Sequence, residues 1–460
     1  MKLPLLILLG GILGGCASSN QLPPDTTTAV LIPPVSWSAV TAENAVRPGS
    51  ITDEWLKDFN SPQLEQLVAE AIAHNHDLKI AALNWYSANE TASIASSNLL
   101  PTIEGGISSK RSRSISSTDR ASISNRHTLD VSAVWEVDLW NRLSNQERSA
   151  ITLTEAVAAD LRAARLSLAA EVAQNWFDSV ESKQQTELAE YQLNADQQAL
   201  KVVEDRFQNG LVDALDLHLI KIELTASEER LASKRMGQNL LLRELETLLG
   251  RYPAAELTVS EPMPEIGGSI PAGLPSDLLK RRPDIAASNK RMVAAGLDAE
   301  VAAKNRLPSF SLTASGGTSS SELKNLLDWD FLIWSLLGDL TQPLFQQERL
   351  KAEEMLERIE HREALINHAQ IIRTAFREVE DALDADHYQR LRVESLTRAA
   401  NESHSAAVLA LYRYQNGLTD ILTLLDAKQR AYTHESKRLR AVADHINNRI
   451  TLHLALGGSF

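Results

Sequence analysis

The chain has 460 residues, a formal net charge of −14 and a hydrophobic content of 43%. The negative charge argues against nucleic acid as a partner. Aromatic residues make up only 5% of the chain while alanine and leucine are abundant, which is typical of long packed helices.

The N-terminal segment predicts export and lipidation. Lys2 precedes a short apolar core at residues 3–13, so residues 1–15 are expected to be a signal peptide. Cys16, the only cysteine, follows two glycines in a pattern that resembles the bacterial lipobox, where the thiol is lipidated. The alternative is an incidental cysteine within a signal peptide. In the first interpretation, residues 16–60 form a lipidated tether and an entry segment.

Most of the remaining chain is a tandem repeat. Gln208-Asn209-Gly210-Leu211 recurs as Gln415-Asn416-Gly417-Leu418, and the segment ending at Pro101 resembles the one ending at Pro308. Both pairs share one offset of 207 residues (415−208 and 308−101). Such a constant offset predicts two structural repeats. We place them at residues 61–250 and 276–460, joined by a linker at residues 251–275.

The first repeat is expected to hold one helix from Pro62 to Leu100, two strands, a long helix and a returning helix. Apolar residues at steps of three and four between Leu153 and Val180 mark one face of the long helix. That helix has about 67 residues, or roughly 100 Å at 1.5 Å per residue, which is too long for a compact domain. It ends at the Gln-Asn-Gly-Leu turn, and Asp213 is expected to cap the returning helix.

The second repeat is expected to follow the same plan. Its first helix starts near Asp284, its long helix starts near Phe345, and Asp420 caps its returning helix. The two shorter helices that flank each long helix are expected to stack end to end beside it, because their summed length roughly equals the length of the long helix.

The strands alternate apolar and polar residues with period two. We expect them at about residues 102–114, 127–140, 309–318 and 329–342. They are either amphipathic hairpins on a soluble core or transmembrane barrel strands with the apolar face toward lipid. Four strands cannot close a barrel, and an open edge in lipid leaves backbone groups unpaired. The second interpretation therefore predicts three chains and twelve strands.

The connection between the first two strands is basic. It contains Lys110, Arg111, Arg113 and Arg126 among many serines. Two interpretations stay open: a solvated hairpin tip, or a contact with anionic lipid headgroups.

The order and spacing of several motifs resemble the TolC-type outer-membrane efflux proteins, in particular the lipidated NodT-like branch that serves RND pumps. These motifs are Cys16 in its lipobox, the entry segment at residues 55–64, and the segments 305–308, 340–345, 376–383 and 414–417. The resemblance implies a mainly α fold with β structure. It implies a homotrimer in the outer membrane, whose twelve-stranded barrel continues into a long α-helical barrel across the periplasm.

The same resemblance implies a passive exit duct for small molecules and drugs, joined by a periplasmic adaptor to an inner-membrane RND transporter. The two Gln-Asn-Gly-Leu turns would contact the adaptor. The pore constriction would be built from Asp426, Leu422, Arg413 and Tyr414. No cofactor is expected beyond a covalent lipid on Cys16.

Catalytic and metal motifs are not evident in the sequence. His74 and His76 are two residues apart, so on one helix they would lie on different faces. We therefore expect no enzyme. Two alternatives to the efflux duct stay open: the duct of a type I protein secretion system, and a lipid-anchored coiled-coil scaffold.

Overall fold

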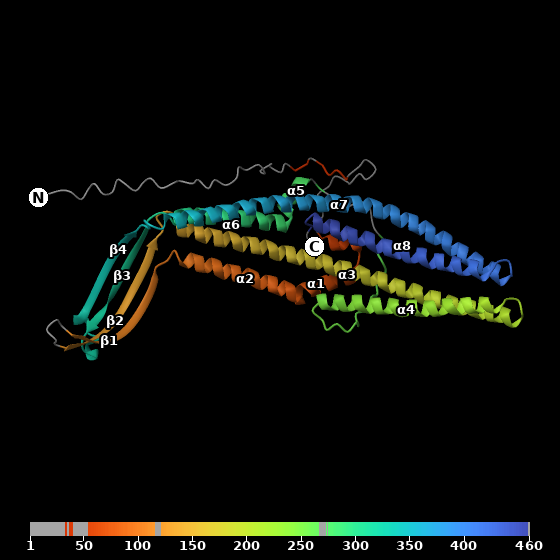
Figure 1. Ribbon diagram of the computed structural model, residues 1–460, viewed down its shortest axis with the longest axis horizontal. Coiled ribbons are helices and arrows are strands. Elements are labelled where there is room, and N and C mark those ends of the chain that lie inside the picture. The colour runs from red at the N-terminus through yellow and green to blue at the C-terminus, as the bar shows by residue number, and fades with distance from the viewer. Residues whose placement is uncertain are drawn as a thin grey trace.

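The structure, a computed structural model, describes residues 33–34, 36–39, 54–115, 121–265, 273 and 275–458. It is elongated, with a four-stranded sheet at one end and long helices leading away from it (Figure 1). The expected signal peptide, Cys16 and most of the tether lie outside the described residues. Among the residues described, none of the helices combines the length and the apolar character that a membrane crossing requires.

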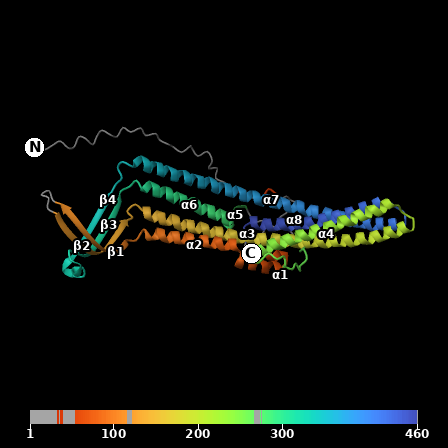
Figure 2. The ribbon, with the colours of Figure 1, turned by 60° about the horizontal axis from the view of Figure 1, so that its bottom comes forward.

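Two long helices run through the helical part, and each is flanked by shorter helices. The long helices α3 and α7 have 67 and 69 residues. α3 packs against α2 and α6 near the sheet and against α4 and α8 farther away, while α7 packs against α6 and α8 (Figures 1 and 2). The bounds are α2 His76–Ser97, α3 Arg142–Gln208, α4 Ala214–Leu248, α6 Pro283–Lys304, α7 Gln347–Gln415 and α8 Ile421–Ala455. Shorter helices thus follow one another along each long helix, as the repeat predicted.

The prediction of one unbroken helix from Pro62 to Leu100 is wrong. The segment forms α1 (Pro62–His74) and α2, with Asn75 between them in a non-helical conformation. The Asn75 side chain accepts the Leu78 N–H and donates to the Leu248 carbonyl at the end of α4, both at 3.0 Å. It therefore caps α2 and binds the end of the returning helix at the same point. His74 and His76 lie on either side of this break.

The second repeat breaks at the matching place. α5 (Pro275–Arg281) and α6 are separated by Arg282, which is 207 residues after Asn75. Pro283 occupies the first turn of α6, where its missing N–H costs nothing. Arg282 binds both Asp284 and Glu378 at 2.7 Å, so this joint is tied to α7.

The sheet is antiparallel in the order β1-β2-β3-β4, with β1 and β4 at its two edges. The strands are β1 Thr102–Ile115, β2 Ala121–Val137, β3 Ser309–Ser320 and β4 Leu332–Thr341. β2 starts six residues before its expected start at 127 (127−121). β4 starts later than expected because Trp329–Phe331 form a 3-10 helix, which Asp328 caps by accepting the Asp330 N–H.

The largest apolar core lies at the waist, halfway along α3. Trp55 and Phe59 of the entry segment insert there, Phe59 against Phe177 with ring centroids 5.2 Å apart. Trp55 stacks on His453 of α8 at 5.7 Å. The core thus joins the entry segment, the first repeat and the end of the second repeat.

A buried ion pair joins α3 to α8 nearer the far end. Lys428 Nζ lies 2.5 Å from Asp196 Oδ1, and the side chains are 10% and 0% exposed. Gln192 Nε2 donates to both oxygens of the Asp196 carboxylate at 3.1 Å. Removing one partner of such a pair leaves an uncompensated buried charge.

We predict that Lys428→Met destabilises the protein by about 3 kcal/mol, because the Asp196 carboxylate stays buried without its cation. The measurement is the thermal loss of helical circular dichroism in detergent. Lys437→Met, the same change at an exposed position of α8, is the control and should have little effect. Equal midpoints for the two variants would contradict the prediction.

A second prediction concerns how the stability of the fold depends on pH through His453 at the waist. Burial, helped by the charge of Arg449, lowers the pKa of His453 to about 4, whereas the unfolded value is about 6.5. Because the unfolded chain binds this proton more readily, the free energy of unfolding is unaffected above about pH 6.5. It falls by about 3 kcal/mol as the pH drops toward 4. His453→Gln should flatten the fall of the melting temperature over that range. A slope equal to that of the unmodified protein would refute this assignment.

Candidate functional site

Both long helices end in the same turn at the end of the molecule far from the sheet (Figures 1 and 2). Gly210 and Gly417 have φ of 67° and 71°, a left-handed conformation that favours glycine. The Leu211 N–H donates to the Arg206 carbonyl and the Leu418 N–H to the Arg413 carbonyl, both at 2.8 Å. The two turns are therefore alike in structure as well as in sequence, and both leucines are exposed.

The returning helices begin with aspartate caps, as predicted. Asp213 accepts the N–H groups of Leu215 and Asp216, and Asp420 accepts the Thr423 N–H at 2.7 Å. The backbone hydrogen bond from Thr423 lowers the pKa of Asp420. Both caps fix the start of a returning helix directly after its turn.

Tyr414 joins the two hairpins at this tip. Its side chain is 1% exposed, and its hydroxyl donates to Asp216 Oδ2 at 3.2 Å. Burial and the nearby Asp216 carboxylate raise the pKa of Tyr414 to about 12, so the hydroxyl keeps its proton at neutral pH. The end of α7 is therefore hydrogen-bonded to the start of α4.

Arg206 strengthens the same junction from the end of α3. Its guanidinium lies 5.0 Å from the centroid of the Tyr414 ring, within the range of a cation–π interaction. It also donates to the carbonyl oxygens of Tyr414 at 2.6 Å and Gln415 at 3.0 Å. These carbonyls end α7, so a cation there also complements the helix dipole. Next to this network, buried apolar residues of all four helices pack together: Ala199, Val203, Ile220, Ala410, Ile421 and Leu424.

The other predicted constriction residues lie on the exposed surface of the α7–α8 hairpin. Arg413 Nη2 is 3.5 Å from the Leu418 carbonyl of its own turn. Leu422 is 61% exposed. Asp426 pairs with Arg430 at 2.8 Å, and both side chains are exposed. Leu422 and Asp426 are four residues apart, so they share one face of α8. Within the single chain, only Tyr414 of the four enters the Arg206–Asp216 network.

Arg206 and Asp216 were missed by sequence reasoning. A signal existed for Arg206, because it is the repeat counterpart of Arg413 (413−206 = 207). Asp216 corresponds to Thr423 (423−216 = 207), so the repeat gave no signal for it.

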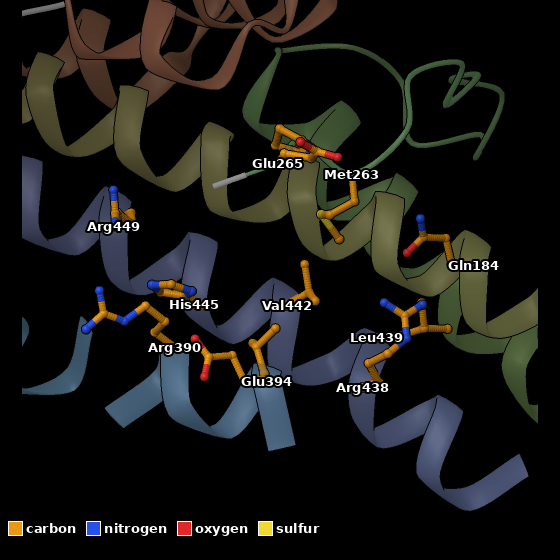
Figure 3. A pocket seen from close by; sticks show the side chains of 12 residues that line it. Gln184, Met263, Glu265, Arg390, Glu394, Arg438, Leu439, Val442, His445 and Arg449 are labelled. Atoms are coloured by element: carbon orange, nitrogen blue, oxygen red, sulfur yellow. The ribbon is translucent and has the colours of Figure 1, made fainter. Parts of the chain in front are cut away.

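A cavity of about 670 Å³ opens at the waist between α3, the segment 263–265, α7 and α8 (Figure 3). His445 Nε2 and Arg449 Nε contact Asp386 Oδ1 at 2.9 and 2.6 Å. Burial alone would raise the pKa of Asp386, but its hydrogen bonds and the Arg449 charge lower it. These contacts tie α7 to α8 beside the cavity. In the described part of the chain, no cluster of three or more His, Cys, Asp or Glu is placed to hold a metal ion.

Comparison with known proteins gives consistent matches over the chain. Residues 67–251 and 274–458 each match the family described as Outer membrane efflux protein. The chain is 31% identical over 478 aligned positions to the pyoverdine export outer membrane protein OpmQ of Pseudomonas putida, covering 100% of this chain and 98% of that protein. The two family segments coincide with the two repeats of the fold.

Solved structures of outer-membrane channels share the fold of this chain. The outer-membrane channel OprN superposes with a TM-score of 0.86 at 26% identity, covering 93% of this chain and 98% of that one. The CmeC outer membrane channel of Campylobacter jejuni gives 0.88 at 24% identity, with 93% and 94% covered, which shows the shared fold. With both repeats matched and a relative aligned over its full length, the chain belongs to the outer membrane efflux protein family.

Proposed function

We propose that three copies of this outer-membrane efflux protein form the passive exit duct of a tripartite pump. Their sheets would close a twelve-stranded barrel, and their helices would form a tunnel across the periplasm. Small molecules would enter from an inner-membrane RND transporter through a periplasmic adaptor. The covalent lipid on Cys16 would add an anchor in the outer membrane.

The exposed apolar face of the sheet carries this proposal. Ile103, Ile107, Trp334 and Leu336 lie on one face, in the register Ile103↔Ala133↔Ala314↔Leu336, and each is at least 68% exposed in the single chain. A face of this kind is unfavourable in water and favourable in lipid. Edge strands in lipid must find hydrogen-bond partners. Pairing β1 with β4 of the next copy supplies them.

The helices support the same arrangement. α2 has exposed apolar residues on its surface, including Leu83 and Ile94, and α7 has Leu356 and Ile366. Because α3 is flanked on both sides by helices of its own chain, the open sides belong to α2, α4 and α7. Contact of α7 with α2 and α4 of the next copy would cover these residues and close the tunnel.

The family and the sheet both favour a duct over a coiled-coil scaffold. OpmQ is named for the export of pyoverdine, which favours small-molecule efflux over protein secretion. The two turns at residues 208–211 and 415–418 end the tunnel with exposed Leu211 and Leu418, and we assign the adaptor contact to these turns.

We place the constriction at the same tip. The Arg206–Tyr414–Asp216 network would hold the α7–α8 hairpin against α3 and α4 in the closed state. Leu422 and Asp426, on one face of α8, would then line the narrow passage together with Arg413. Three Asp426 side chains around the axis would attract cations, although each is paired with Arg430 in the single chain.

We predict that the purified mature protein migrates as a trimer when unheated and as a monomer after boiling. The reason is that barrel strands from separate chains dissociate only when the sheet is denatured. The measurement is gel electrophoresis of detergent extracts, with crosslinking as a check of copy number. A monomer in native detergent extracts would overturn the proposed duct.

We also predict that Tyr414→Phe opens the tip. The variant keeps the ring under Arg206 but loses the hydrogen bond to Asp216, which as a bond to a charged group contributes about 1.5–3 kcal/mol. The closed population should therefore fall by roughly 10- to 100-fold relative to the open one. Single-channel conductance in planar bilayers measures this. Tyr412→Phe, at an exposed tyrosine two residues earlier, is the control; equal conductance of both variants would count against the gate.

A further inference from the structure

The β1–β2 hairpin extends beyond the rest of the sheet. β3 pairs with β2 only as far as His127↔Ser320, and β4 pairs with β3 only as far as Thr318↔Leu332. Beyond that level, residues 110–115 of β1 and 121–126 of β2 continue as a two-stranded ribbon. Figure 1 shows this hairpin at the end of the sheet away from the helices. We call residues 110–115 and 121–126 the outer ribbon.

The four basic residues of the outer ribbon divide between its two faces. Side chains alternate along a strand, so Arg111 and Arg113 share the face of Ile103 and Ile107. Lys110 lies on the opposite face, directly across from its pairing partner Arg126. On the outer ribbon, the apolar face of the sheet therefore carries two arginines together with Ile123, opposite Arg113, and Ile115 beyond them, while the other face carries a lysine and an arginine.

The register gives the height of the arginines above the apolar band. The apolar face begins, at the end nearest the helices, with the row Val137↔Phe310↔Leu340. Arg111 pairs with Asn125, which lies twelve residues from Val137 in β2 (137−125), toward the hairpin end. At about 3.3 Å per residue and a tilt of about 40°, Arg111 lies roughly 30 Å above that level. The apolar band of such barrels is about 25 Å tall. Arg111 and Arg113 thus fall in the outer headgroup layer.

The two arginines have no anionic partner in the described chain. Arg111 and Arg113 are exposed and form no ion pair with another described residue. No aspartate or glutamate occurs at residues 105–115 or 121–129. In the described β3–β4 connection, Glu322 pairs with Lys324 at 2.7 Å and Asp328 caps a 3-10 helix. Asp119, between β1 and β2 in the sequence, lies outside the described residues.

We propose that Arg111 and Arg113 bind the phosphorylated headgroups of lipids in the outer leaflet of the outer membrane. This inference rests on the proposed barrel, because the barrel places the apolar face against lipid. Arginine suits the task, since its planar guanidinium binds phosphate oxygens in pairs. The acyl chains of the same lipid pack on Ile103, Ile107 and their neighbours below. The bound lipid fixes the depth of the barrel in the membrane.

The test compares two double variants of the full-length protein that remove the same charge from opposite faces. Arg111→Gln/Arg113→Gln removes the two arginines from the apolar face. Lys110→Gln/Arg126→Gln removes two positive charges from the polar face of the same ribbon. The measurement is the affinity of detergent-purified protein for fluorescent diphosphoryl lipid A in mixed micelles. The trimer and its conductance are checked in the same preparations.

We expect Arg111→Gln/Arg113→Gln to bind this lipid roughly 30-fold more weakly, given the usual contribution of a basic residue near an anionic surface. Lys110→Gln/Arg126→Gln should bind within about two-fold of the unmodified protein, because its changes face away from lipid. Lipid A without phosphates should bind the unmodified protein as weakly as it binds the arginine variant. Inorganic phosphate in excess should not compete, because it lacks acyl chains.

Other results would overturn the proposal. Equal lipid affinity of the two variants as conducting trimers would refute headgroup binding and leave the duct intact. A weakened trimer with unchanged lipid affinity in the arginine variant would assign the arginines to the neighbouring copy instead. Competition by inorganic phosphate would mark a free-anion site. Failure of the unmodified protein to form a trimer would overturn both the duct and the lipid site.

Discussion

The need of every backbone group for a hydrogen-bond partner governs this structure. The described residues of one chain supply four strands, and their sheet ends in two edges, β1 and β4, with an apolar face exposed. In lipid, water cannot satisfy those edges. In the proposed duct, copies of the same chain offer the complementary edge and complete a closed barrel. In the helical part, α2 and α7 also expose apolar side chains. In the proposed duct, contact with the next copy covers them.

The length of the helical part comes from its two longest helices. A tunnel across the periplasm needs continuous helix walls, and α3 and α7 provide them as single helices. The remaining wall is divided into shorter helices that meet at the waist, at Asn75 and Arg282. Free helix ends need partners, and Asn75 serves both α2 and the end of α4. The core around Trp55 and Phe59 forms where these ends meet.

Function then divides between two ends that differ in chemistry. At the far end, a buried tyrosine, an arginine and an aspartate hold two hairpins together. At the sheet end, the proposed contacts are with the membrane, through the apolar face and through Arg111 and Arg113. The long helices connect the two ends through the waist, where the entry segment packs on them.

The sequence alone determined the repeat, the long helices, the strand alternation and the helix caps, because these follow from local periodicity and from short turn motifs. It also contained the break between α1 and α2, since Pro283 minus the 207-residue offset is 76, although we predicted an unbroken helix there. Only the tertiary structure decided that Arg206 stacks on Tyr414 and that Asp216 accepts its hydroxyl. Those residues lie about two hundred positions apart, and their contact depends on how two hairpins pack, which no local pattern encodes.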